Sequence, residues 1–303
     1  MVDRRAQKMP HIPCLLTIAG TDPCGGAGIQ VDLQVFRDFG FHGLSVVTAV
    51  LSQNTRGVQR VDAMGADCVA QQLETLLEDI QPAGIKIGLL PSAEVVQAVS
   101  RVLKKLAQKK ICCPVIFDPV LASSSRHDLV GAGSVEAMRT DLIPCVDLLT
   151  PNLAEAELLL DTRLQTRGDF DAAANDLLAL GCRAVLLKAG HLTPQEAARE
   201  AKDAPAARRI RDVFADPHAV TTLRAMPAIA QDVRGTGCQL SSALLASVVA
   251  SGADARSGDL SARPGLVDAA EKARAYLNDL LHTRRRNIGG GRPVIVRERP
   301  APH

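Results

Sequence analysis

Short, nearly continuous apolar runs alternate along this 303-residue chain with longer stretches of helical periodicity. Such runs predict buried strands at residues 15–19, 44–49, 85–88, 115–118, 147–150 and 184–188. Strands that are apolar on both faces are typical of a parallel sheet covered by helices on both sides. The repeated strand–helix order therefore predicts a doubly wound α/β sandwich.

The stretches between these runs carry apolar residues at helical spacing. The clearest follows Ser92, a candidate N-cap, and places Val95, Val99, Val102 and Leu106 on one face. Further helices are predicted around residues 29–36, from a cap at Asp169 to about Leu180, and over residues 265–281. Residues 189–232 predict a loop and hairpin excursion, with strand-like pieces at 211–214 and 219–222.

The composition limits the functions to consider. Lys and Arg number 35 against 33 Asp and Glu, so a broad surface for nucleic acid or a membrane is not expected. The sequence has no Trp, one Tyr and no run of 18 apolar residues, which argues against base-stacking platforms and transmembrane helices. Eight cysteines without a Cys-x-x-Cys or zinc spacing predict a reduced, cytoplasmic protein.

The segment Gly235-Thr236-Gly237-Cys238 precedes an apolar run from Leu240 that predicts a helix. The glycines let several backbone N–H groups converge at the positive end of that helix, an arrangement that binds phosphate-like anions. Cys238 is expected in the first turn, where the same field favours a thiolate. Alone, the pattern favours a simpler interpretation, an ordinary glycine-rich helix start with a buried cysteine.

Polar or glycine-rich segments follow most of the predicted strands. They are residues 20–28, 52–57, 118–120, 150–155 and 188–191. In an open parallel sheet these positions share one edge, where ligands bind. Each has a simpler interpretation by itself, such as a helix cap at Asn152 or a strand-end lysine at Lys188. Together they predict a site at this edge.

Residues 18–32 closely resemble the opening motif of hydroxymethylpyrimidine/phosphomethylpyrimidine kinases of thiamine biosynthesis, in the ribokinase-like superfamily. Similar motifs follow in family order up to about residue 293: Gln53-Asn54-Thr55-Arg56-Gly57-Val58, Lys86-Ile87-Gly88-Leu89, Asp118-Pro119-Val120, Thr150-Pro151-Asn152, Lys188-Ala189-Gly190-His191 and Gly235-Thr236-Gly237-Cys238. The resemblance implies a ribokinase-like three-layer α/β/α sandwich with a mostly parallel central sheet. It implies one kinase domain over residues 13–303, after a flexible tail of residues 1–12.

The same resemblance implies an ATP- and Mg²⁺-dependent kinase of 4-amino-5-hydroxymethyl-2-methylpyrimidine. The enzyme would phosphorylate the hydroxymethyl group and, in a second step, the monophosphate. Family members are often dimers, so a homodimer is expected. Phosphoryl transfer depends mainly on positioning and charge stabilisation, which backbone N–H donors at a helix N-terminus can provide.

Roles for individual residues also follow from the resemblance. The pyrimidine pocket is expected to contain Gly20, Asp32, Gln53, Leu89 and Val120. ATP is expected to contact Asn152, Glu155 and Lys188, and magnesium to contact Asp118 and Glu155. The anion hole is expected at Gly235, Thr236 and Gly237, with Cys238 as the general base on the substrate hydroxymethyl group.

The sequence departs from the family pattern near the anion loop. Arg234 replaces the usual histidine before it, and Gln239 replaces the usual threonine after it. Ala189 replaces a glycine, and residues 124–128 replace a Ser-Gly-Asp loop. Arg234 either strengthens anion binding or crowds a substrate that already carries a phosphate, so Arg234 and Gln239 leave the second phosphorylation open.

Other functions are compatible with the same motifs. A pyridoxal kinase shares the fold and the loop, and Leu89 and the 121–128 loop are where such a change of substrate is expected. A pyrimidine-binding protein without turnover is a second alternative. A thiol-based acyl-transfer enzyme is disfavoured because nothing in the sequence marks His191 as a partner of Cys238.

Overall fold

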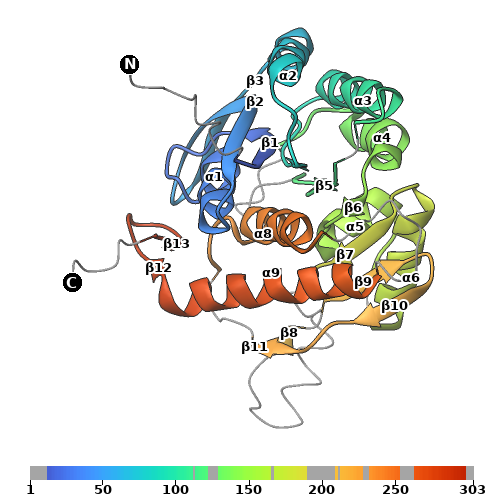
Figure 1. Ribbon diagram of the computed structural model, residues 1–303. Helices are drawn as coiled ribbons and strands as arrows, with labels where there is room; N and C mark the ends of the chain where they lie inside the picture. The colour runs from blue at the N-terminus through green and yellow to red at the C-terminus, as the bar shows by residue number, and fades with distance from the viewer. Residues whose placement is uncertain are drawn as a thin grey trace, which may run out of the picture.

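The computed structural model describes residues 12–111, 113–121, 129–164, 167–189, 209–210, 212–227, 232–252 and 263–297. Within these residues one sheet has nine strands in the order β10-β9-β7-β6-β5-β4-β1-β2-β3 (Figure 1). The strands are β1 (Cys14–Gly20), β2 (His42–Asn54), β3 (Gly57–Ala63), β4 (Gly84–Ile87), β5 (Val115–Phe117), β6 (Leu148–Leu149), β7 (Ala184–Leu187), β9 (Val213–Asp216) and β10 (Ala219–Thr222).

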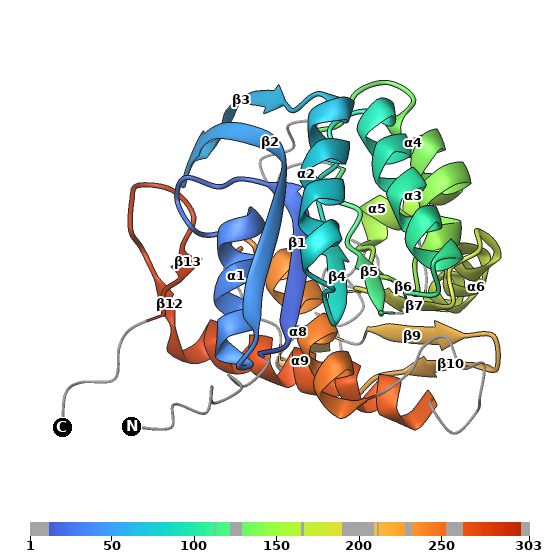
Figure 2. The same cartoon turned by 45° about the horizontal axis from the view of Figure 1, so that its top comes forward.

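The helices cover both faces of this sheet (Figures 1 and 2). One face is covered by α2 (Ala66–Asp79), α3 (Ala93–Gln108), α4 (Ser134–Ala137), α5 (Leu153–Leu160) and α6 (Arg167–Ala179). The other face is covered by α1 (Gly28–Asp38), α8 (Thr236–Ser251) and α9 (Arg263–Thr283). The expected three-layer α/β/α sandwich is confirmed.

Side chains that alternate between the two faces of the sheet contribute to two hydrophobic cores, one on each face. Leu16 and Ile18 of β1 pack with α2 and α3, whereas Leu15 packs with α1 and α8. Successive strand side chains point to opposite faces, so a strand that is apolar throughout fills both cores. Thr17 and Lys86, which pair across β1 and β4, interrupt this apolar pattern beneath α1 and α8.

The described helices and strands match most of the predicted elements. Ser92 caps α3 by accepting a hydrogen bond from the Val95 backbone N–H at 3.3 Å. Two expectations were wrong in detail. Asp169 lies in the first turn of α6, which begins at Arg167, and so does not start the helix. The second strand does not end before residue 52; it continues to Asn54 and pairs with the antiparallel β3.

Shorter elements complete the description. They are a π-helical turn (Met138–Leu142), a 3-10 turn (Ile143–Cys145) and the two-residue strands β8 (Arg209–Ile210), β11 (Met226–Pro227), β12 (Arg285–Arg286) and β13 (Val294–Ile295). The expected hairpin is present as β9 and β10. Residues 1–11 of the predicted tail (1–12), residues 122–128 of the 121–128 loop, and Gly190 and His191 lie outside the described residues. Within the described part, no helix has the length and hydropathy needed to cross a membrane.

The topology defines where a ligand site is expected. The strand β1 lies between β2 and β4, and all three run parallel. The chain adds β2 on one side of β1 and later adds β4 on the other side, so the strand order reverses at β1. In open α/β sheets ligands bind at such a switch point, beyond the carboxyl ends of the strands. The segments after β1, β4, β5, β6 and β7 all reach this edge.

Candidate active site

The start of helix α8 forms the centre of the site. Gly235 caps the helix with a φ of 70°, and the first helical hydrogen bond runs from the Gln239 N–H to the Gly235 carbonyl at 2.9 Å. The N–H groups of Thr236, Gly237 and Cys238 precede this bond and have no partner within the helix. The geometry of these free N–H groups is the one that an anion site at this helix end requires.

Gly235 also brings two loops together. A Cβ placed at this residue would collide with the backbone carbonyl of Gly26, in the loop after β1. The positive φ and this backbone contact both require glycine. The anion loop and the first glycine-rich loop therefore pack against each other without side chains between them.

A buried lysine–carboxylate cluster lies beside the anion loop. The Lys188 Nζ lies 2.6 Å from Asp118 Oδ1 and 3.8 Å from Glu155 Oε2. A Cβ on Gly237 would lie 3.3 Å from the same Nζ, so the lysine faces the start of α8. Burial would raise the pKa of Asp118, but Lys188 and Lys86 outweigh it and hold the pKa below its usual value. The Lys188 ammonium therefore lies next to the free N–H groups of α8, and the ionised Asp118 compensates its charge.

Asn152 and Glu155 begin helix α5 through a capping box. The Asn152 side chain accepts from the Glu155 N–H at 3.0 Å, and the Glu155 carboxylate accepts from the Asn152 N–H at 2.7 Å. Burial raises the pKa of Glu155 to about 7, with Lys188 acting against the rise. Asn152 is therefore a helix cap, as its simpler interpretation predicted. The capping box also holds Glu155 next to Lys188.

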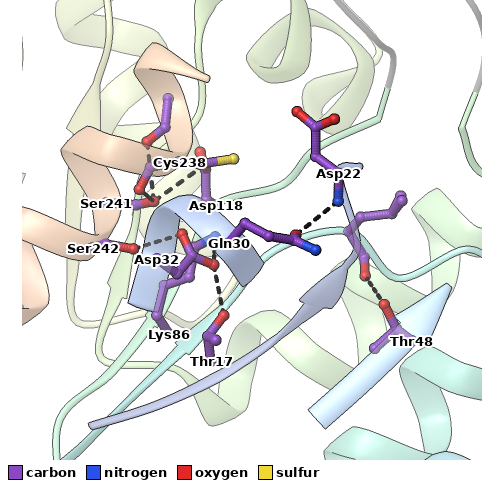
Figure 3. Close-up of polar contacts among 12 residues, drawn as sticks. Thr17, Asp22, Gln30, Asp32, Thr48, Lys86, Asp118, Cys238, Ser241 and Ser242 are labelled. Carbon is purple, nitrogen blue, oxygen red and sulfur yellow. Dashed lines mark hydrogen bonds and ion pairs between the residues drawn. The ribbon is translucent and has the colours of Figure 1, made fainter. Parts of the chain in front are cut away.

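Asp32 lies at the floor of the site, under α8, with no exposed surface. Its carboxylate accepts from Thr17 Oγ1 at 2.6 Å, Lys86 Nζ at 2.9 Å and Ser242 Oγ at 2.7 Å (Figure 3). Asp118 has a similar bond from Ser241 Oγ at 3.3 Å. Both oxygens of Asp32 accept hydrogen bonds from protein groups, so the carboxylate links Lys86 of β4 to Ser242 of α8.

Lys86, Ser241 and Ser242 are residues of this site to which no role was assigned from the sequence. Lys86 is fully buried on β4, and both side chains of its ion pair with Asp32 are buried. A lysine inside an otherwise apolar strand is the one local signal that could have identified it, because such a residue is almost never buried unless paired.

The apolar wall of the site is formed by the end of β1, by β2 and by the segments that follow β4 and β5. A Cβ on Gly20 would lie 3.0 Å from both Leu51 and Leu89, and Leu89 packs in one small apolar cluster with Val120. Half-buried Gln53 adjoins this wall, with its side-chain nitrogen 3.5 Å from the Thr21 carbonyl. The structure therefore brings Gly20, Gln53, Leu89 and Val120 to one region, and it places Asp32 beneath it.

The two residues that flank the anion loop point away from its N–H groups. Arg234 is buried and donates to Gln53 Oε1 at 2.9 Å and to Asp22 Oδ2 at 3.4 Å. Gln239 is fully buried and accepts from Arg297 at 3.1 Å. Neither side chain therefore occupies the anion-binding end of α8.

Cys238 lies in the first turn of α8 and is partly buried. Burial raises the pKa of its thiol to about 11, although Lys86 and a hydrogen bond from the Gly28 backbone act in the opposite direction. The expectation that the helix field alone would favour a thiolate was therefore wrong for the ligand-free protein, because desolvation is the stronger effect.

The donor set fits a magnesium ion bound mainly through a nucleotide. Among the described residues no three His, Cys, Asp or Glu side chains gather closely enough to hold a metal by themselves. Asp118 and Glu155 nevertheless supply carboxylate oxygens, and both lie within 4 Å of the same lysine nitrogen. Magnesium commonly binds through one or two carboxylates together with water and phosphate oxygens.

Comparison with known proteins identifies close relatives. The sequence profile of the phosphomethylpyrimidine kinase family matches residues 22–293. The chain is 40% identical over 232 residues to hydroxymethylpyrimidine/phosphomethylpyrimidine kinase of Escherichia coli (strain K12), an overlap that covers 76% of this chain and 81% of the relative.

Solved structures agree with this similarity. A phosphomethylpyrimidine kinase from Clostridium difficile 630 has a TM-score of 0.68 and 29% identity, covering 89% of this chain and 99% of the other. A pyridoxal kinase from Staphylococcus aureus in complex with pyridoxal has a TM-score of 0.75 and 24% identity, covering 95% and 94% of the two chains. At that identity the second similarity shows the fold alone. The ribokinase-like fold implied by the motifs is confirmed.

Gly235→Ala tests the contact between the two glycine-rich loops. Its matched control is Gly252→Ala, at the other end of α8, which has a φ of 66° and no atom within 4 Å of an added Cβ. The control is expected to lose about 1 kcal/mol of unfolding free energy from backbone strain. Gly235→Ala is expected to lose roughly 1–3 kcal/mol more, because of the collision. Equal losses in urea unfolding would contradict the proposed loop contact.

Asp32→Ala tests the buried ion pair. Removing the carboxylate leaves the Lys86 ammonium buried without its partner, and the expected loss in unfolding free energy is about 3–5 kcal/mol. The double variant Asp32→Leu, Lys86→Met is expected to recover most of this loss, since it removes both charges. A single variant within about 0.5 kcal/mol of the wild type would show that the pair is not a structural unit.

The Cys238 thiol is expected to react slowly at neutral pH. With a pKa of about 11, the rate of iodoacetamide alkylation should rise roughly tenfold per pH unit from pH 7 to 10, because only the thiolate reacts. Peptide mass spectrometry separates this thiol from the exposed Cys68, which serves as an internal reference. A rate that reaches its plateau by pH 8 would contradict the assigned effect of burial.

Proposed function

Because the chain belongs to the phosphomethylpyrimidine kinase family, we propose that it phosphorylates 4-amino-5-hydroxymethyl-2-methylpyrimidine in thiamine biosynthesis. ATP is the proposed phosphate donor, and the hydroxymethyl oxygen is the acceptor. The main support is that the N-terminal end of α8 packs against the Lys188–Asp118 pair at Gly237 and against the glycine-rich loop after β1 at Gly235.

Each part of the site has a distinct task in this proposal. The N–H groups of residues 236–238 and the Lys188 ammonium stabilise charge on the transferred phosphoryl group. Cys238 acts as the thiolate, which is the minor form at neutral pH in the ligand-free protein, and this thiolate accepts the proton of the substrate hydroxyl as the new P–O bond forms. Gln53 and the wall of Gly20, Leu89 and Val120 bind the ring, and Asp32 supports the floor beneath it.

Asn152, Glu155, Lys188 and Asp118 form the proposed nucleotide and metal side of the site. Magnesium, when bound, neutralises phosphate charge, and Asp118 and Glu155 are the carboxylates proposed to hold it. The homodimer and the cytoplasmic location stay predictions.

The monophosphate is proposed as a second substrate. Arg234 was the residue expected either to attract or to obstruct a second phosphate. Its guanidinium is bound by Asp22, Gln53 and the Asn54 carbonyl, so it neither blocks the anion loop nor adds a free charge to it. This placement supports both phosphorylation steps.

A pyridoxal kinase activity is not favoured. The relative at 40% identity is named as a pyrimidine kinase, whereas the pyridoxal kinase at 24% identity supports the fold alone. A pyrimidine-binding protein without turnover is also not favoured, because Lys188, Asp118 and the anion loop are assembled together.

Product analysis tests the proposal. With ATP and Mg²⁺, the protein is expected to convert the hydroxymethylpyrimidine to its monophosphate and then its diphosphate, detected by ADP release and mass spectrometry. Pyridoxal is expected to be a poorer substrate. Turnover of pyridoxal only would overturn the proposed substrate, and pyrimidine binding without ADP release would indicate a non-catalytic protein.

Cys238→Ala tests the general base. Turnover of the pyrimidine is expected to fall by about 10²–10⁴-fold, while the Kd for ATP stays within about threefold of the wild type. Cys68→Ala, at an exposed cysteine of α2, is the control and should retain full turnover. Full activity in Cys238→Ala would exclude this thiol as the base.

A further inference from the structure

Arg234 is a buried arginine whose guanidinium is bound by the loop after β1 and by the end of β2. One guanidinium nitrogen donates to the Asn54 carbonyl at 3.1 Å, and another donates to Gln53 Oε1 at 2.9 Å and Asp22 Oδ2 at 3.4 Å. The backbone N–H of Arg234 is bound separately, by the Pro293 carbonyl at 3.0 Å. The side chain thus links the loop after β1 to the hairpin that carries Gln53.

These contacts allow only one orientation of the Gln53 carboxamide. A guanidinium can only donate hydrogen bonds, so the Gln53 atom that faces it must be the oxygen. The other end of the carboxamide lies 3.5 Å from the Thr21 carbonyl, which can only accept, so that atom must be the nitrogen. Two independent neighbours therefore select the same orientation.

The hydrogen-bonding capacity that remains on Gln53 has a definite pattern. A carboxamide has two acceptor lone pairs and two donor hydrogens. Arg234 uses one lone pair and Thr21 uses one hydrogen, which leaves one acceptor and one donor on the same planar group. This pair is complementary to a heteroaromatic edge in which an amino group adjoins a ring nitrogen.

Stability alone does not account for this arginine. Its charge is compensated by Asp22, which has no exposed surface, and its Nε is buried with no hydrogen-bond partner among the described residues. Buried ion pairs contribute little net stability, and a buried donor without a partner is unfavourable. The arrangement is better explained by the group that Arg234 orients.

We propose that Arg234 is a positioning residue that fixes the Gln53 carboxamide and so selects substrates with an amino group beside a ring nitrogen. The inference rests on the proposed function, since it takes Gln53 as part of the pyrimidine pocket. The inference explains the substrate preference by a residue that flanks the phosphate-binding loop and contacts Gln53.

Steady-state kinetics of Arg234→Met test the inference. The KM for the hydroxymethylpyrimidine is expected to rise by about tenfold or more, with the KM for ATP and kcat within about twofold of the wild type. Preference for the pyrimidine over pyridoxal should fall by a similar factor. Arg234→Lys keeps a donor at this place and is expected to recover part of the loss.

Arg297→Met is the matched control. Arg297 also donates to a glutamine oxygen, that of Gln239, beside the same loop, but it lies with Asp38 and Tyr276 away from the pocket. This variant should lower thermal stability without changing the substrate preference. If both arginine variants change the preference equally, the effect is general loosening and the inference is overturned.

A double-mutant cycle separates positioning from a purely structural role. If Arg234 acts through Gln53, Arg234→Met should have almost no further effect on the pyrimidine KM in the Gln53→Ala background. Additive effects would overturn the inference. Melting temperatures of the same four proteins can be compared without any substrate. The effects of the two substitutions on melting temperature are expected to be non-additive whatever the substrate is.

The outcomes also distinguish this inference from the proposed function. A wild-type protein that does not phosphorylate the pyrimidine overturns the proposed function. A wild-type protein that does, together with an unchanged KM and preference in Arg234→Met, overturns the inference alone.

Discussion

The geometry of the site depends on how the first turns of helix α8 rest on buried ion pairs. Neighbouring serines of the helix bind one carboxylate each: Ser241 binds Asp118, which pairs with Lys188, and Ser242 binds Asp32, which pairs with Lys86. These bonds set the height and rotation of the helix over the sheet. The direction of its free N–H groups and the place of the Cys238 thiol follow from that position.

Such an arrangement is poorly explained as a device for stability. Buried ion pairs are often no more stabilising than apolar side chains of similar size, and each uncompensated charge is costly. Preorganised charges and dipoles in a water-poor site are, however, what a phosphoryl-transfer enzyme requires. The Lys188 ammonium and the loop at 235–238 already lie next to each other in the ligand-free protein, so this part of the site is preorganised.

Much of this site could be predicted from local patterns. Lys188, Asn152 and the loop at 235–238 each follow or precede a recognisable strand or helix, and parallel topology places such segments on one edge. The partners of these groups could not be predicted in the same way. Ser242 and Asp32 are 210 residues apart, and Arg234 and Gln53 are 181 apart, so only the folded chain shows that they meet.

The sequence by itself determined the layered fold, the family and the edge of the sheet that carries the site, because these follow from periodicity and contiguous motifs. Tertiary structure decided which groups remain available to a ligand. It engages both oxygens of Asp32 in the floor, and it turns Arg234 from a possible phosphate ligand into a partner of Gln53. Desolvation of Cys238 likewise depends on how α8 packs in the folded protein. The sequence of residues 235–238 could therefore not predict the burial that raises the pKa of this thiol.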